Sequence, residues 1–199
     1  MLSVRPQSFV TIIAALICAH PLVASPEGAL KKPWDQVYVD VETGCLWKVI
    51  APVQYRMMPN MLTWRSKPVL STELPDGSKV IVRTRFSLLG QWIETGIENR
   101  YLGFMAAPSL EWWNREATWS VYSGLGGGMG CIDSQEVTGG QGQDRTLNWF
   151  GTLGVARPVN KSMEIKVGGL FQHFSNGGAT NPNVGLNSLG CTAGVSWGF

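Results

Sequence analysis

The sequence of 199 residues has little net charge and no apolar run of the length that a membrane-spanning helix needs. Sixteen basic and 14 acidic residues leave a formal charge of +2, which argues against nucleic acid as a partner and against electrostatic lipid binding as the main role. The longest apolar segment, near the N-terminus, falls short of the ~20 residues of a transmembrane helix.

The N-terminal segment is typical of a signal peptide. Arg5 is the only charged residue before Glu27, an apolar run follows over residues 9–19, and small residues lead to Ala24. A charged start, a short apolar centre and a small residue at the cut define such peptides. We therefore predict a signal peptide over residues 1–24 and a single domain over residues 25–199.

Cysteine is also scarce. Once the signal peptide is removed, Cys45, Cys131 and Cys191 remain. An odd number in an exported chain excludes complete internal pairing and does not indicate a disulfide framework. We interpret the three as scattered small apolar side chains, with one bonded pair left open.

What the sequence does contain is an alternation of large apolar residues with small ones, and it is clearest at the C-terminus. Large or apolar residues occupy the odd positions: Leu189, Cys191, Ala193, Val195, Trp197 and Phe199. Glycine, serine and threonine occupy the even ones, so the segment predicts a strand with one apolar and one small face. Bacterial outer-membrane barrels commonly end on such an aromatic residue. In a barrel the large face meets lipid and the small face fits the lumen.

Seven further segments show the same alternation of residue types or lie between turn residues. They cover residues 36–49, 60–70, 79–92, 99–113, 118–133, 145–158 and 163–172, the last leading to His173 and Ser175. With the C-terminal segment they predict an all-β fold, an eight-stranded antiparallel transmembrane β-barrel of the bacterial outer membrane. A soluble lipocalin-like barrel is the structural alternative. Five tryptophans near strand ends would form the aromatic girdles: Trp112, Trp113, Trp119, Trp149 and Trp197.

Charged residues at lumen-facing positions predict a buried polar network. Glu164 and Lys166 have this parity in the seventh segment. Arg83 and Arg85 either join the same network or bind lipid phosphates at a rim, and the sequence favours neither.

The candidate site follows from the only histidine of the mature chain. His173 and Ser175 are two residues apart, so in a strand they project from the same face. Serine needs an adjacent base to become a nucleophile. The glycine- and asparagine-rich segment that follows can offer N–H groups to a developing oxyanion.

Parity places this pair on the lipid-facing side, where polar groups are costly unless they have a task or lie at the membrane rim. The C-terminus of such barrels is periplasmic, so the seventh strand runs outward and ends at the cell surface. We therefore expect the site to face the outer leaflet at the headgroup level, where lipopolysaccharide resides.

The segment from His173 to Gly178, continued by residues 181–185, resembles the signature of the outer-membrane lipid A 3-O-deacylases, the PagL family. The resemblance implies an eight-stranded barrel that hydrolyses the ester-linked 3-hydroxyacyl chain at position 3 of lipid A without a metal or other cofactor. It implies His173 as general base, Ser175 as nucleophile, and oxyanion contributions from Gly178 and Asn183.

One position departs from the family pattern. Asn187 stands where characterised members carry the glutamate of the triad. An amide oxygen can orient the imidazole, but it cannot stabilise the imidazolium as a carboxylate would. Asp133 or Asp144 is the alternative acid.

The predicted function is thus a serine esterase of the outer membrane that acts on lipid A. The predicted partners are lipopolysaccharide, outer-membrane lipid and, through the C-terminal strand, the barrel assembly machinery. A barrel of the same fold that binds or senses envelope lipid without turnover is the alternative. A small passive pore is disfavoured because side chains fill an eight-stranded lumen.

Overall fold

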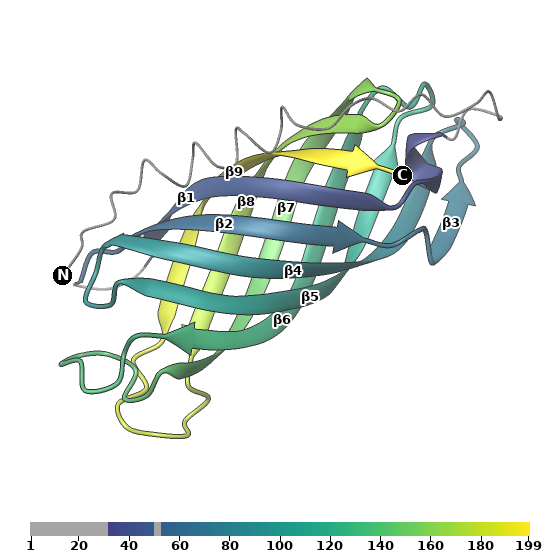
Figure 1. The fold of residues 1–199 in the computed structure, drawn as a ribbon. Helices are drawn as coiled ribbons and strands as arrows, with labels where there is room; N and C mark the ends of the chain where they lie inside the picture. Colours follow the sequence, from purple (N-terminus) through teal and green to yellow (C-terminus); the bar gives the residue numbers. More distant parts are fainter. Residues whose placement is uncertain (1–31, 50–52) are drawn as a thin grey trace. The chain divides into compact units, whose positions relative to one another are not determined.

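The computed structural model describes residues 32–49 and 53–199, which form an antiparallel β-barrel (Figure 1). The predicted signal peptide lies outside the described residues. The elements are η1 (Pro33–Asp35), β1 (Tyr38–Lys48), β2 (Arg56–Arg65), β3 (Leu70–Glu73), β4 (Lys79–Thr95), β5 (Arg100–Trp113), β6 (Ser120–Ile132), β7 (Arg145–Asn160), β8 (Met163–Ser175) and β9 (Leu186–Gly198). No helix among these residues is long and apolar enough to cross a membrane.

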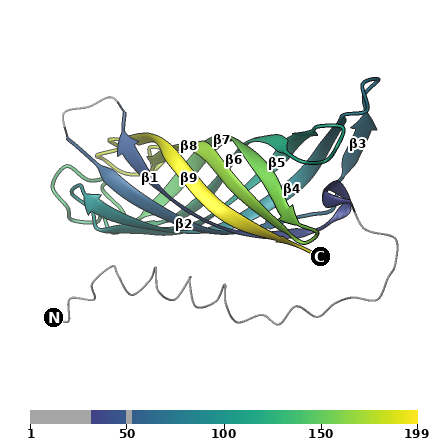
Figure 2. The same ribbon diagram turned by 90° about the horizontal axis from the view of Figure 1, so that it is seen from above.

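Eight of the strands close into a ring (Figure 2). The order is β2-β1-β9-β8-β7-β6-β5-β4, and β2 pairs with β4 to complete it. The first and last strands, β1 and β9, lie side by side at the seam, in register from Tyr38–Gly198 to Lys48–Ser188. The predicted eight-stranded barrel is confirmed.

The second strand differs from the prediction. β2 begins at Arg56 and ends at Arg65, whereas the sequence predicted residues 60–70. Pro59 lies inside β2, opposite Gln91 of β4, although proline usually marks a strand boundary because it has no N–H. The chain then leaves the barrel, and residues 70–73 form the short strand β3, which pairs only with β4 and was not predicted.

The alternation predicted for the C-terminal strand holds throughout β8 and β9. Even-numbered residues face the lumen and are mostly buried, while odd-numbered residues face outward. Large apolar side chains are exposed around the whole outer wall, for example Leu88, Leu102, Leu125, Leu153 and Val167. An outer wall of this kind is suited to lipid. It argues against the soluble alternative.

A network of buried charges fills the half of the lumen nearer the C-terminus. Arg65 binds Asp40 at 2.9 Å, Glu111 at 2.7 Å and Glu164 at 3.1 Å. Lys166 binds Asp40 at 2.8 Å and Glu42 at 3.1 Å. The predicted lumen positions of Glu164 and Lys166 are therefore correct.

Arg83 and Arg85 belong to the same network and not to a rim. Arg83 lies 3.2 Å from Glu111, and Arg85 lies 3.5 Å from Glu42. Both arginines are buried, so neither contacts the lipid phase. The lumen interpretation of these two residues is the correct one.

Apolar side chains fill the other half of the lumen, toward the long loops. The cluster includes Leu46, Met57, Leu89, Tyr101, Met105, Phe150, Leu170, Phe174 and Leu186. At the opposite end Trp113 packs against Trp34, with ring centroids 6.1 Å apart. Trp113 is fully buried, so its predicted place in an outer aromatic girdle is wrong. Its odd number puts it on the inner face of β5, where it helps to close the lumen.

Candidate active site

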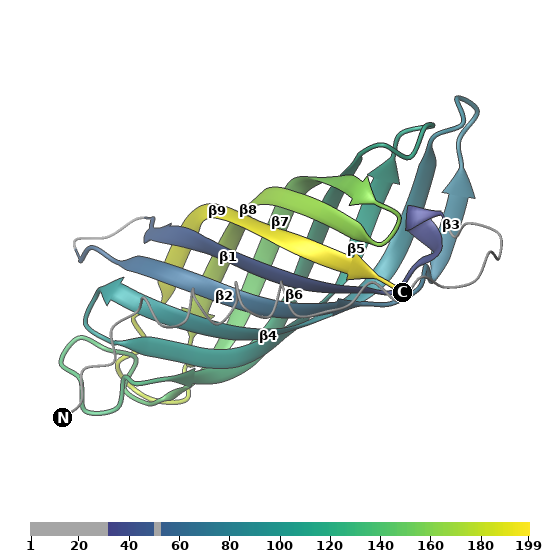
Figure 3. The ribbon, with the colours of Figure 1, turned by 45° about the horizontal axis from the view of Figure 1, so that its top comes forward.

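The candidate site lies on the outer face of β7, β8 and β9. These three strands are neighbours in the barrel (Figure 3). In the strand register His173 stands opposite Trp149 on one side and opposite Asn187 on the other. Ser175, the last residue of β8, stands opposite Leu147. Pairing of the strands thus places residues from three separate segments in one patch.

His173 and Asn187 are joined by a hydrogen bond. The distance between His173 Nδ1 and Asn187 Oδ1 is 2.8 Å. With the amide oxygen as acceptor, Nδ1 carries the proton, so Nε2 is left with its lone pair and can act as a base. Asn187 therefore sets the tautomer of the imidazole.

Ser175 shares the outer face with His173 but does not hydrogen-bond to it within the described residues. The two side chains are i and i+2 on one strand, so they project in the same direction. A nucleophile and its base are often farther apart in a free enzyme than in its substrate complex. The absence of a direct hydrogen bond is therefore compatible with a serine–histidine pair in a free enzyme.

Aromatic rings line the other side of the histidine. The Trp149 ring lies with its centroid 5.6 Å from that of His173 and 4.9 Å from that of Phe171. Trp149 and Leu147 are about half exposed on the outer surface. The histidine thus lies between a polar partner, Asn187, and an apolar wall directed toward lipid.

The segment between β8 and β9 is organised by the side chain of Asn176. Its Nδ2, which has two hydrogens to donate, lies within hydrogen-bonding distance of four acceptors: Thr180 O at 2.9 Å, Thr180 Oγ1 at 3.0 Å, Pro182 O at 3.2 Å, and Gln141 O in the loop between β6 and β7. Its backbone N–H donates to Asn183 Oδ1 at 3.0 Å. Asn176 is almost fully buried, so one amide fixes the loop that begins next to Ser175.

The two predicted oxyanion contributors lie in this loop. The Gly178 N–H donates to Asn176 Oδ1 at 2.8 Å, and it is therefore already engaged in this structure. No atom lies within 4 Å of the position that a Gly178 side chain would take, so the space beside this residue is open. Asn183 Oδ1 accepts the hydrogen bond from the Asn176 N–H, so Asn183 Nδ2 remains available as a donor.

The two alternative acids lie elsewhere. Asp133 accepts hydrogen bonds from the backbone N–H groups of Asn99 and Arg100 at 2.9 and 3.0 Å. Partial burial would raise the pKa of Asp133, but these hydrogen bonds outweigh it and hold the pKa below its usual value. Asp144 accepts from the N–H groups of Ser134 and Gln135. Each carboxylate fixes a loop, and neither contacts His173.

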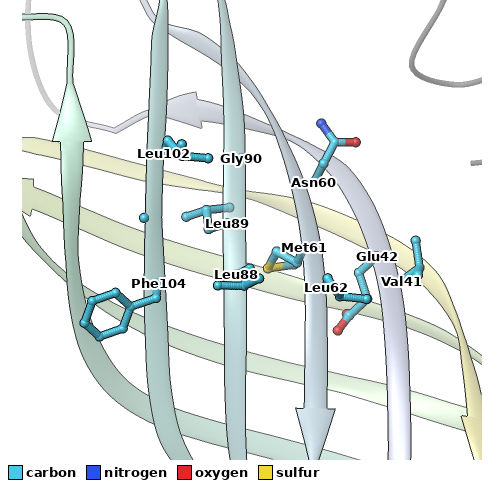
Figure 4. A pocket seen from close by; sticks show the side chains of 11 residues that line it. Val41, Glu42, Asn60, Met61, Leu62, Leu88, Leu89, Gly90, Leu102 and Phe104 are labelled. Atoms are coloured by element: carbon cyan, nitrogen blue, oxygen red, sulfur yellow. The ribbon is translucent and has the colours of Figure 1, made fainter. Parts of the chain in front are cut away.

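A groove of about 500 Å³ lies on another part of the wall, across β1, β2, β4 and β5 (Figure 4). Leu62, Leu88, Leu102 and Phe104 line it from the outer face, with Gly90 between them. Neither His173 nor Ser175 lines this groove, so it is separate from the candidate site.

Two residues of the site were not predicted from the sequence. Trp149 could not be placed beside His173 because the register of β7 on β8 is not visible in either segment alone. Asn176 did carry a signal, since asparagine before two glycines favours a turn in which the side chain binds the backbone.

A closed barrel with an apolar outer wall is the architecture of outer-membrane proteins, and a serine beside a histidine whose tautomer is fixed is suited to ester hydrolysis. The model of a protein family, the lipid A 3-O-deacylases (PagL), matches residues 20–196. The chain therefore belongs to the lipid A 3-O-deacylase family. This confirms the predicted family and, at that level, the predicted deacylase function.

One solved structure, that of PagL, supports the fold. The crystal structure of the outer-membrane enzyme PagL superimposes with a TM-score of 0.57 at 16% sequence identity, covering 79% of this chain and 97% of that one. Neisserial surface protein A gives a TM-score of 0.46 at 11% identity, covering 82% and 96% of the two chains. A search of curated protein sequences finds no match.

Proposed function

We propose that this chain hydrolyses the ester-linked 3-hydroxyacyl chain of lipid A with Ser175 as nucleophile, His173 as general base and Asn187 as the residue that orients the base. The observation that supports this assignment best is the 2.8 Å contact between His173 Nδ1 and Asn187 Oδ1 on the face that also carries Ser175. This contact leaves Nε2 free for the serine proton.

In the first half-reaction Ser175 Oγ attacks the ester carbonyl while His173 Nε2 takes its proton. The tetrahedral intermediate then collapses, the sugar oxygen leaves with the proton from His173, and the acyl group stays on Ser175. In the second half-reaction water attacks this acyl group with His173 again as base. The products are the 3-hydroxy fatty acid and free Ser175.

The oxyanion is stabilised by donors from the loop after β8. Asn183 Nδ2 needs no rearrangement to serve, because Asn183 binds Asn176 through its oxygen. The Gly178 N–H contributes once it leaves Asn176 Oδ1 or shares its hydrogen with the substrate. A single such donor is typically worth ~10²–10³ in kcat.

The site faces the outer leaflet. β8 runs away from the end of the barrel that carries the C-terminus, so His173 and Ser175 lie at the end with the long loops (Figure 1). The C-terminus of bacterial barrels is periplasmic, which puts this loop end at the cell surface. The C-terminal strand, ending on Phe199, is the segment that the barrel assembly machinery would recognise.

The decisive experiment uses the purified barrel with lipid A in detergent micelles. Release of a 3-hydroxy fatty acid is followed by mass spectrometry for the natural protein, Ser175→Ala and His173→Ala. Both variants should lose the activity and still migrate faster before boiling than after it, as closed barrels do. Wild-type activity in either variant would place the site elsewhere.

A barrel that binds lipid A without turnover is the second candidate, and Asn187 is the observation that favours it. An amide in place of a carboxylate costs serine proteases ~10⁴ in rate. Under this alternative the natural protein binds lipid A micelles but releases no fatty acid, and Ser175→Ala binds equally well.

A further inference from the structure

The outer face of β7 carries an apolar stretch between two arginines. Arg145 begins the strand, Arg157 lies twelve residues further along it, and both are exposed. At ~3.4 Å per residue and a tilt of ~45°, this separation spans about 40 Å along the strand and about 29 Å across the barrel wall. The hydrocarbon core of a bilayer is ~30 Å thick. The separation of the two arginines therefore matches the thickness of that core.

The residues between the arginines support this placement. Leu147, Trp149, Leu153 and Val155 face outward from β7 and are exposed by 47 to 62%. Arg145 is the first charged residue on this face at the end with the long loops. It consequently lies at the level of the lipid headgroups.

Arg145 also lies next to the candidate nucleophile. Leu147 is the register partner of Ser175, so Arg145 lies two residues beyond that pair on the same face. Residues in such a diagonal relation have Cβ atoms ~7–8 Å apart, within reach of a long side chain. A ligand bound to the Arg145 guanidinium thus has room to place a group a few ångströms away at Ser175 Oγ.

The positive charge of Arg145 has no acidic partner in the part of the chain that the structure describes. Its register partner on β6 is Cys131, which is uncharged. Arg56, another arginine exposed at the loop end, instead binds Glu94 at 3.1 Å. The guanidinium of Arg145 is therefore available to an anion from the membrane surface.

We propose that Arg145 binds a phosphate group of lipid A and so positions the scissile ester at Ser175; this rests on the function proposed above. Lipid A carries phosphates on its glucosamine disaccharide, and the 1-phosphate is on the same sugar ring as the ester at position 3. A guanidinium fork matches phosphate oxygens and binds them through two parallel hydrogen bonds. Arg145 touches no reacting atom, so it is a positioning residue.

The test compares kcat/KM for lipid A with both phosphates, with only the 1-phosphate, with only the 4′-phosphate, and with neither. Arg145→Ala should lower kcat/KM for bisphosphorylated lipid A by roughly 10- to 100-fold, the range for a hydrogen bond to a charged group. The loss should appear mainly in KM, because a phosphate contact is made equally before and in the transition state. Arg145→Lys should recover part of the lost kcat/KM, because the lysine ammonium still attracts the phosphate as a point charge.

The phosphate-free substrate is the internal reference. Arg145→Ala and the natural protein should hydrolyse it at equal rates. The monophosphorylated substrates identify the group: the variant loses activity only on the one that retains the phosphate bound by Arg145. An equal loss on the phosphate-free substrate would indicate a structural role and would overturn the proposal.

Two matched variants control for general electrostatics. Arg100→Ala removes an exposed charge at the loop end of β5, two strands from β7, and Arg157→Ala removes one at the other end of β7. Both should retain natural kcat/KM. A loss for Arg100→Ala as large as that for Arg145→Ala would show unspecific attraction of anionic lipid and refute a defined subsite.

A binding measurement tests the phosphate subsite independently of the proposed hydrolase function. In a Ser175→Ala background, binding of bisphosphorylated lipid A micelles is measured with and without Arg145→Ala. Weaker binding in the double variant supports the phosphate subsite even if the natural protein releases no fatty acid. Unchanged binding and unchanged KM would overturn it, whatever the catalytic outcome.

Discussion

Asn187 Oδ1 accepts a hydrogen bond from His173 Nδ1 over 2.8 Å, across the junction of the last two strands of the barrel. The two residues are direct register partners, so the pairing of β8 with β9 holds the contact in place. The proposed base is consequently oriented by rigid sheet, whereas the proposed oxyanion donors belong to a loop.

Replacement of Asn187 tests this relationship. Asn187→Ala should lower kcat by ~10²–10⁴ with little change in KM, because only support of the transition state is lost. Asn187→Glu should match or exceed the natural protein, since a carboxylate both fixes the tautomer and stabilises the imidazolium. Steady-state kinetics on lipid A micelles measure both. Full activity of Asn187→Ala would mean that another acceptor holds the imidazole.

Asn176 should matter for rate and not for the stability of the barrel. Asn176→Ala removes the side chain that joins Thr180, Pro182, Gly178 and the neighbouring loop, so the oxyanion donors lose their fixed position. We expect kcat to fall by ~10-fold or more, in line with partial loss of an oxyanion donor. Thr180→Val removes one acceptor only and should have a smaller effect. A large fall in the thermal stability of Asn176→Ala would instead identify the loop as part of the folding core.

The buried charge network of the lumen predicts that substitutions of two arginines will differ in their effect on the stability of the barrel. Arg65→Met leaves Asp40, Glu111 and Glu164 buried without their shared partner and should destabilise the barrel by ~3–5 kcal/mol. Arg56→Met breaks only the exposed pair with Glu94 and should cost ~0–1 kcal/mol. Urea unfolding in detergent, followed by the gel shift on boiling, gives the comparison. Equal midpoints for the two variants would contradict the structural role assigned to the network.

Two cysteines allow a test of the pairing between β1 and β9 at the seam of the barrel. Cys45 of β1 and Cys191 of β9 are register partners on the outer face, and both are free thiols in this structure. Partners in a hydrogen-bonded antiparallel pair have Cα atoms ~5.5 Å apart, within the ~4.4–6.8 Å range of disulfides. A chemical oxidant should therefore link them within the folded barrel, with loss of two hydrogens by mass spectrometry.

Cys131 provides the control for this experiment. It lies on β6, separated from β9 by β7 and β8, so it should remain alkylatable after oxidation. Cys45→Ser should abolish the internal link. A link between Cys131 and Cys191 in the monomer would be incompatible with the strand order.

Parts of this architecture were predictable because the alternation of inward- and outward-facing residues along a strand is a local property of the sequence. The parity of Glu164 and Lys166 identified lumen positions, and the parity of His173 and Ser175 identified the outer face, without knowledge of any partner strand. Both assignments rest on the two-residue period of a strand.

Other parts depend on contacts between distant segments. Trp113 lies next to Trp112, and their positions near the end of the predicted strand did not show which of the two closes the lumen; in the structure Trp113 is buried and packs on Trp34. The extent of β2 was mispredicted because Pro59 lies within a strand whose position is set by its pairing with β4. The row formed by Trp149, His173 and Asn187 likewise requires the registers of two strand pairs.

The filled lumen has a kinetic consequence. Buried charges in one half and apolar side chains in the other leave the outer wall as the face from which a substrate can reach the proposed site at His173 and Ser175. Encounters then occur by lateral diffusion within a leaflet. Turnover should follow the mole fraction of lipid A in the surface, and dilution of micelles with inert detergent should slow the reaction at constant bulk substrate concentration.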